Sequence, residues 1–140
     1  MAVAAEIRKP LMLLSVSAIR ESSSENIEEK LLNKKEDVEK YETLTSDIKK
    51  AFNKEFFNAE TKQYGTSSQF SNAVPIFMDI VEPQYKEAVM QNLVADIKAK
   101  GDRLTTGDVG NRYLFQALAR NGENETMYKM NNHYDAPGYG

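Results

Sequence analysis

Apolar residues recur every three or four positions along most of this chain, which is the spacing of one face of an α-helix. The longest stripe predicts a helix over about residues 36–57 and consists of Val38, Tyr41, Leu44, Ile48, Phe52 and Phe56. Glycine and proline divide the following chain into shorter helices. We expect one helix that begins near residues 66–72 and runs to about residue 81, and others over about residues 84–100, 109–120 and 123–130.

Signals at the helix ends support this division. Residues 66–72 form an uncapped polar segment, and we expect Pro75 in the first turns of the next helix, where proline is tolerated. Pro83 breaks the chain and opens another helix. The end of that helix is predicted at Gly101, which follows two lysines, and the end of the next at Gly122.

The first 26 residues have a different character. An apolar run, residues 10–19, follows Arg8 and Lys9 in the outline of a signal peptide, but no small-residue cleavage site comes after it. We therefore interpret residues 1–26 as an N-terminal arm or an extra helix. Within them, residues 21–26 (ESSSEN) are expected to form a polar, serine-rich joint.

The pattern as a whole predicts an all-α fold of antiparallel helical hairpins, because no segment alternates with the period of two typical of a strand. At 140 residues the chain is one domain at most, and its 41% apolar and 28% charged residues are ordinary for a globular protein. The net charge of -3 argues against nucleic acid as a partner. The longest apolar run is too short to span a membrane.

The absence of cysteine excludes disulfides and thiolate metal sites but is compatible with a periplasmic or secreted location. The single histidine, His133, lies two residues before Asp135, and no nucleophile elbow accompanies it, so a catalytic triad and a zinc site are both disfavoured. Loop carboxylates at Asp102, Asp108 and Asp135 could serve a paired-carboxylate hydrolase. Loop aspartates more often cap helices, however, and we interpret Asp108 first as an N-terminal cap.

Several tyrosines lie in or beside expected loops: Tyr64, Tyr113, Tyr134 and Tyr139. Aromatic faces in such places can stack on sugar rings, or they can pack between helices. The sequence leaves both interpretations open.

The stretch at residues 104–119, LTTGDVGNRYLFQALA, together with the ending YDAPGYG at residues 134–140, resembles the catalytic domain of bacterial α-L-rhamnosidases. These enzymes are six-hairpin glycosidases. Residues 35–65 and 67–77 resemble the same family. The resemblance covers roughly residues 27–140 and implies part of an (α/α)6 barrel, whereas residues 1–26 do not resemble the family.

The resemblance implies an inverting hydrolase of terminal α-L-rhamnosides that uses neither cofactor nor metal. It places the loop at residues 105–108 and the terminal loop near the sugar pocket, with Asp108, Arg112 and Tyr139 as substrate-binding residues. It also places both catalytic carboxylates outside this chain, so we expect no catalytic residue among these 140.

The sequence thus predicts a fragment of a rhamnosidase-like hydrolase that is inactive alone and self-associates through exposed helix faces. The substrate of the parent enzyme would be a rhamnose-containing glycan or glycoside. Two other interpretations remain. One is a stand-alone all-helical interaction module without catalysis, and the other is a small active hydrolase that uses Asp108 and Asp135.

Overall fold

The computed structural model describes residues 16–25, 27–28 and 35–134. The chain divides into two compact units, Met1–Phe57 and Asn58–Gly140. The described residues are predominantly helical, so the expected all-α fold class is confirmed. None of the helices in this described part combines the length and the apolar composition that crossing a bilayer requires.

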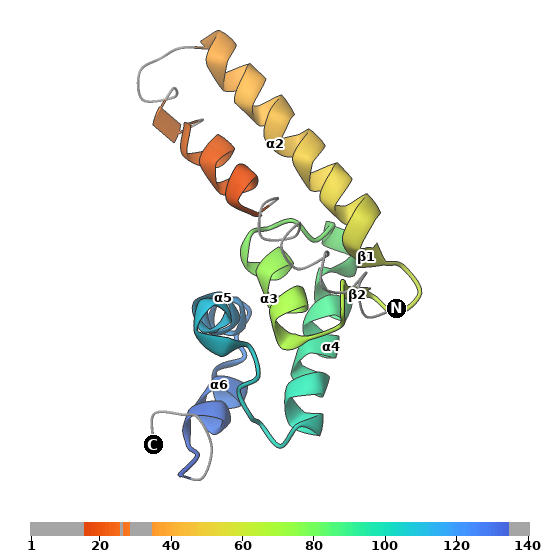
Figure 1. The fold of residues 1–140 in the computed structure, drawn as a ribbon, viewed down its shortest axis with the longest axis vertical. Helices are drawn as coiled ribbons and strands as arrows, with labels where there is room; N and C mark the ends of the chain where they lie inside the picture. Colours follow the sequence, from red (N-terminus) through yellow and green to blue (C-terminus); the bar gives the residue numbers. More distant parts are fainter. Residues whose placement is uncertain (1–15, 26, 29–34, 135–140) are drawn as a thin grey trace. The chain divides into compact units, whose positions relative to one another are not determined.

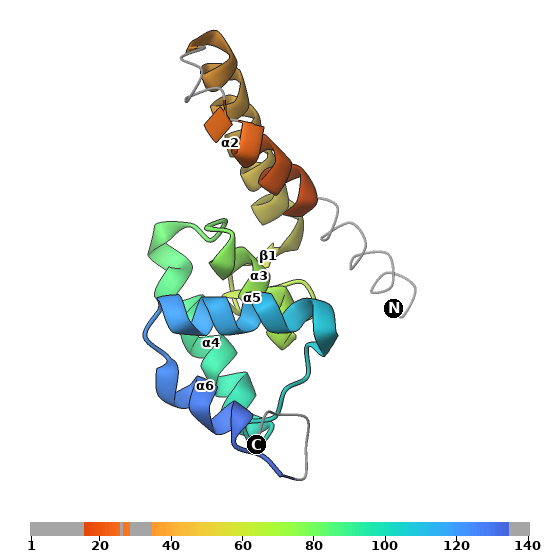
Figure 2. The same ribbon diagram turned by 90° about the vertical axis from the view of Figure 1, so that its left-hand side faces the viewer.

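The first unit pairs a helical segment, residues 16–25, with the long helix α2 (Lys35–Phe56) (Figures 1 and 2). Ser22 joins them: its side chain is 4% exposed, its hydroxyl donates to the Tyr41 carbonyl at 3.2 Å, and its oxygen lies 2.7 Å from the Thr45 hydroxyl. The polar joint expected at residues 21–26 is therefore wrong for residues 21–25. Serine is tolerated in this helix because its hydroxyl finds a partner, as when Ser24 donates to the Arg20 carbonyl at 3.0 Å.

The bounds of α2 agree with the predicted helix to within one residue. Its apolar stripe is buried only near the C-terminal end, where the rings of Phe52 and Phe56 lie 4.9 Å apart and both side chains are almost fully buried. Leu44, in the middle of the stripe, is 44% exposed. Helical spacing thus identified the helix correctly, but it did not indicate how much of the stripe is covered.

A short hairpin leads from α2 into the second unit. It consists of β1 (Phe57–Asn58) and β2 (Gln63–Tyr64). The Asn58 side-chain oxygen accepts hydrogen bonds from the backbone N–H groups of Glu60 and Thr61 at 2.9 and 3.1 Å. This asparagine-based turn explains why the chain reverses here.

The second unit contains α3 (Gln69–Phe77), the 3-10 turn η1 (Pro83–Tyr85), α4 (Lys86–Ala99), α5 (Gly107–Arg120) and α6 (Asn124–Asn131). Helices α3 and α4 run in opposite directions (Figure 1), and α5 crosses them on one side and packs on α3 and α6 (Figure 2). The core of this unit consists of Tyr64, Ala73, Val74, Ile76, Ile80, Val81, Val89, Met90, Leu93, Val94, Ile97, Leu114, Ala117, Leu118 and Met130.

Helix α3 differs from the prediction in its cap and at its C-terminal end. It begins at Gln69, within the expected segment, but it is capped, because the Ser68 side chain accepts a hydrogen bond from the Ser71 N–H at 3.2 Å. Pro75 lies near the C-terminal end of the helix and not in its first turns, and α3 ends at Phe77. Pro75 lacks the N–H that would bond back to the preceding turn, and the end of α3 is closed by the Asp79 and Ile80 N–H groups, which donate to the carbonyls of Ile76 and Pro75.

Helices α3, α4 and α5 end in the same way. After α4, the Gly101 and Asp102 N–H groups each donate at 3.0 Å to carbonyls of the last turn, and Gly101 has φ +69°. These two bonds form a Schellman motif. The same pair of bonds follows α3 at Asp79, with φ +54°, and α5 at Gly122. The predicted ends at Gly101 and Gly122 are thus confirmed.

We expect Tyr64 to make the fold sensitive to alkaline pH. Its side chain is 1% exposed, and burial, assisted by the negative charge of Glu82, raises the pKa of its hydroxyl above the ordinary value. In the unfolded chain the phenol ionises near pH ~10, so the stabilisation is complete below that pH and declines as the pH rises, by up to about 1.4 kcal/mol per unit.

Urea unfolding followed by circular dichroism between pH 8 and pH 11.5 would measure this loss for the wild-type chain and for Tyr64→Phe. The wild-type free energy of unfolding should fall more steeply than that of the variant. Parallel profiles for the two proteins would rule out Tyr64 as the cause.

Candidate functional site

The residues that the sequence singled out gather around the start of α5. Asp108 and Arg112 both lie on this helix and are exposed. Tyr139 and Asp135 lie outside the described residues, so their places in the site stay predictions. The described part of the candidate site is therefore the loop at residues 101–106 and the first two turns of α5.

Asp108 is the second residue of α5, not its cap. Thr106 occupies the N-cap position, and its hydroxyl donates to the Asn111 side-chain oxygen at 2.6 Å. The interpretation of Asp108 as a cap is therefore wrong, because the helix begins two residues before the apolar pattern becomes visible.

Arg112 follows Asp108 by one helical turn. Residues four positions apart lie on the same face of a helix, and an acid that precedes a base at this spacing is a favourable pair. The two side chains therefore present a carboxylate and a guanidinium on one exposed strip of α5. Such a strip offers hydrogen-bond acceptors and donors side by side.

A close approach fixes the start of α5 against α3. A methyl group added at Gly110 would lie 2.5 Å from the Cβ of Thr106 and 3.0 Å from the ring of Phe70. Only a glycine fits this space without displacing the N-cap residue. Gly110 therefore determines how near the Asp108 turn comes to α3.

The structure adds a residue that sequence reasoning missed. Gln69, the first residue of α3, is fully buried, and its side-chain amide reaches the loop before α5. Its Nε2 donates to the Arg103 carbonyl at 2.9 Å, and its Oε1 accepts from the Thr105 N–H at 3.0 Å. Its place at the head of an apolar helix was visible in the sequence, but no local signal distinguished it from a solvated glutamine.

His133 lies against the loop that follows α4. Its Nε2 lies 3.2 Å from the carbonyl oxygen of Asp102, so the segment after α6 is in contact with the loop after α4. Asp102 itself has φ +57° and directs its Oδ1 into the protein, where that oxygen is buried. Within the described ranges, no three histidine or acidic side chains cluster closely enough to hold a metal ion.

Two of the four loop tyrosines pack in the protein and do not form sugar platforms. Tyr113 lies edge-on between Phe70 and Phe77, with ring centroids 6.5 and 5.4 Å apart, and Tyr64 is buried in the core. Tyr134 is 88% exposed. For Tyr64 and Tyr113 the packing interpretation is thus confirmed.

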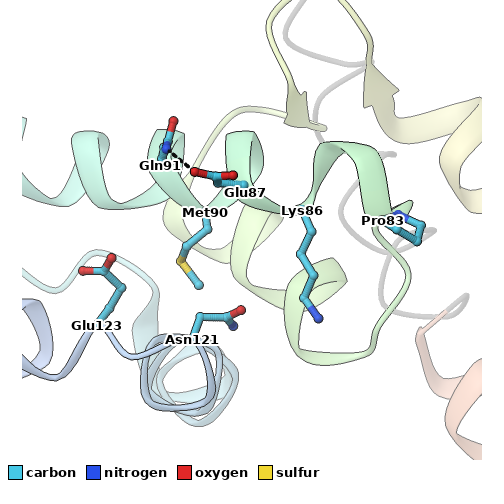
Figure 3. Close-up of a pocket in the computed structure, with 7 residues that line it drawn as sticks. All are labelled: Pro83, Lys86, Glu87, Met90, Gln91, Asn121 and Glu123. Carbon is cyan, nitrogen blue, oxygen red and sulfur yellow. Dashed lines mark hydrogen bonds between the residues drawn. The ribbon is translucent and has the colours of Figure 1, made fainter.

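A surface hollow of about 440 Å³ lies at the other end of α5 (Figure 3). Met90 and Lys86 extend from α4 toward the α5–α6 turn, where Asn121 and Glu123 face them (Figure 3). Its remaining lining residues are Pro83, Glu87 and Gln91. With a rise of 1.5 Å per residue, this hollow lies roughly 20 Å along α5 from Asp108. It is therefore separate from the predicted sugar-site loops.

Comparison with known proteins places these helices within a six-hairpin glycosidase. The model of the bacterial alpha-L-rhamnosidase 6 hairpin glycosidase domain matches residues 23–140. The chain therefore belongs to the bacterial alpha-L-rhamnosidase six-hairpin family.

Individual relatives agree with this family. An alpha-L-rhamnosidase of Formosa agariphila is 32% identical over 100 residues, which cover 71% of this chain and 11% of the relative. The structure of alpha-L-rhamnosidase from Dictyoglumus thermophilum is 34% identical, with a TM-score of 0.75, over 82% of this chain and 13% of that protein.

The Streptomyces avermitilis enzyme, solved in complex with L-rhamnose, shares the fold with a TM-score of 0.83 at 23% identity, over 92% of this chain and 12% of that protein. The chain thus spans about a tenth of the length of the curated relative that it matches.

Replacing Gly110 by alanine should destabilise the second unit. Overpacking a tight contact costs about 1–3 kcal/mol. The better helix propensity of alanine returns at most about 1 kcal/mol. Because the added methyl group would meet Thr106 at 2.5 Å, the steric cost should prevail. Urea unfolding of Gly110→Ala measures the net effect.

Ala119→Gly is the matched control, because Ala119 is exposed on the same helix. It should cost about 1 kcal/mol through propensity alone. If Gly110→Ala raised the free energy of unfolding by about as much as Ala119→Gly lowers it, the close approach to Thr106 would make no contribution to stability.

Proposed function

We propose that this chain forms part of the wall of a rhamnose-binding pocket in an enzyme that hydrolyses terminal α-L-rhamnosides. The observation that carries the proposal is the match of residues 23–140 to the rhamnosidase domain. The buried contacts that hold the loop before α5 support it, because they place Asp108 and Arg112 on a fixed, exposed strip.

The reaction we infer is an inverting hydrolysis. A carboxylic acid protonates the leaving oxygen, while a carboxylate activates a water on the opposite face of the sugar. In such enzymes the two carboxyl groups stand about 6.5–9.5 Å apart, which leaves room for the water. We place both groups in segments of the enzyme other than these 140 residues, as the resemblance implies.

Asp108 suits a binding role better than that of the acid. The resemblance places the general acid in another segment of the enzyme, whereas Asp108 is exposed in the first turn of α5 and open to a ligand. Its carboxylate oxygens would accept hydrogen bonds from sugar hydroxyl groups.

Arg112 and Tyr139 complete the proposed wall. The Arg112 guanidinium, one turn after Asp108, would orient the carboxylate and donate hydrogen bonds to ring or hydroxyl oxygens. Tyr139 would present its aromatic face to the C–H groups of the sugar. The contact between His133 and Asp102 supports this arrangement, because residue 133 thereby lies beside the loop that leads into α5.

The full chain by itself should not hydrolyse an aryl α-L-rhamnoside above the uncatalysed rate, because both reacting carboxyl groups would be missing. Release of the chromogenic phenol over hours measures this. Turnover that is lost in Asp108→Asn would overturn the binding role and identify a small active hydrolase. The interaction module would be favoured if the chain were inactive, monomeric and cooperatively folded, and if it did not support turnover when placed in a rhamnosidase.

A chimera tests the positive side of the proposal. Residues 23–140 would replace the matching segment of the Dictyoglumus thermophilum enzyme, and a second chimera would carry residues 101–122 only. Both should hydrolyse the aryl rhamnoside. In either, Asp108→Asn should lower kcat/KM by about 10- to 100-fold, because a hydrogen bond to a charged group contributes roughly 1.5–3 kcal/mol.

In the chimera that carries residues 23–140, Glu125→Gln provides the matched control. Glu125 is likewise the second residue of its helix, α6, with a base four positions on: Lys129 Nζ lies 2.8 Å from its carboxylate and lowers the pKa of Glu125. Its replacement should change kcat/KM by less than about twofold, as expected for a surface substitution. Equal losses in the two variants, or folded chimeras without any turnover, would contradict the proposal.

A further inference from the structure

The side chain of Gln69 bonds to the loop before α5 as a strand of backbone would. A glutamine carboxamide carries a carbonyl and an NH2 group, so it can present one acceptor and one donor side by side as a peptide unit does. Here the amide donates to the carbonyl of Arg103 and accepts from the N–H of Thr105, so it pairs with two backbone groups spaced two residues apart. These partners lie 34 and 36 positions from Gln69 in the sequence.

Burial makes these two hydrogen bonds obligatory. Gln69 is 0% exposed, and a buried amide that loses its partners costs the full penalty of desolvation. If the loop moved away, the Gln69 amide would stay buried without hydrogen-bond partners, or α3 would have to leave the core. Unlike hydrogen bonds at the surface, these two bonds restrain the loop for as long as α3 stays in the core.

The restraint passes from the loop to the Asp108 turn. Thr105, which donates to Gln69, is followed by Thr106, the N-cap of α5. Thr106 in turn lies against Gly110, and Phe70, the neighbour of Gln69, occupies the other side of that space. Consecutive residues of α3 thus contact the loop and the first turn of α5, so a shift of Thr105 moves the start of the helix.

We propose that Gln69 is a positioning residue for sugar binding: its buried amide holds the loop at residues 103–105, and thereby sets the place of Asp108 and Arg112. The part of this inference that concerns substrate rests on the function proposed above. The part that concerns the loop does not, and it can be measured on the full chain.

The first experiment uses Gln69→Met, which keeps the shape of the side chain and removes both hydrogen bonds. Trypsin cleavage after Arg103 and exchange of the Thr105 amide hydrogen, followed by NMR, report on the loop. Both rates should rise by about 10- to 100-fold, because a buried polar partner is lost. Gln69→Glu keeps the acceptor for Thr105 and loses the donor to Arg103, so exchange at Thr105 should stay closer to the wild-type rate.

Asn72→Leu is the control for general instability. Asn72 is also a fully buried amide of α3, but its side-chain oxygen accepts from the Tyr64 N–H at 2.8 Å and not from the loop before α5. This variant should accelerate cleavage at all tryptic sites together. If Gln69→Met behaved in the same way, or left Arg103 and Thr105 at wild-type rates, the positioning role would be overturned.

The second experiment connects the loop to the sugar. In the chimera that carries residues 23–140, Gln69→Met and Asp108→Asn should each lower kcat/KM, mainly through a higher KM. The double variant should lose no more than about twofold beyond the worse single variant, because both changes remove the same contact. Additive losses would contradict the proposal. Should the chimera lack all turnover, the function proposed above would fail, while the cleavage and exchange rates would still decide the role of Gln69.

Discussion

Two buried carboxamides in the first turns of α3 control how the second unit is arranged. Gln69 and Asn72 are both 0% exposed, and each bonds to backbone from another part of the chain. An amide can enter a core only when its donor and acceptor are both satisfied. Burying α3 between α4 and α5 therefore requires that Tyr64 and the loop at residues 103–105 come to it. The core therefore forms only when these loops are in place. An apolar side chain at position 69 or 72 would not require this, because it has no hydrogen bonds to satisfy.

The helix ends act together with these amides. The Schellman motif after α4 turns the chain at Gly101, so the loop leaves α4 in a defined direction before it meets Gln69. At the far end of the loop, the missing side chain of Gly110 lets α5 settle close to Phe70. The loop that leads to Asp108 and Arg112 is consequently fixed at its start, its middle and its end. An irregular segment can hold binding residues accurately only when it is anchored in this way.

The parts of the structure that depend on local pattern were predictable from the sequence. The spacing of apolar residues located α2, α4, α5 and α6 to within two residues, and glycine located two helix ends, because these signals act between near neighbours. The errors have a different origin. Residues 21–25 were wrongly expected to form a joint, because the partner that holds Ser22 in a helix, Thr45, lies 23 positions away in the sequence. Gln69 was missed for the same reason. The resemblance located the Asp108 loop, whereas only the structure shows what holds it.

The two ends of α5 differ in what they can offer a ligand. At the C-terminal end, the Schellman bonds from Gly122 and Glu123 already occupy carbonyls of the last turn, and Glu123 and Lys86 at the nearby hollow are engaged with Thr126 and Asp79. At the N-terminal end, Asp108 and Arg112 are exposed one turn apart, so an acceptor and several donors lie on the same strip of the helix. A neutral sugar is recognised mainly through hydroxyl contacts with groups of this kind. The resemblance to the rhamnosidases, and not the size of the hollow, is the reason to look for the sugar at the Asp108 end of α5.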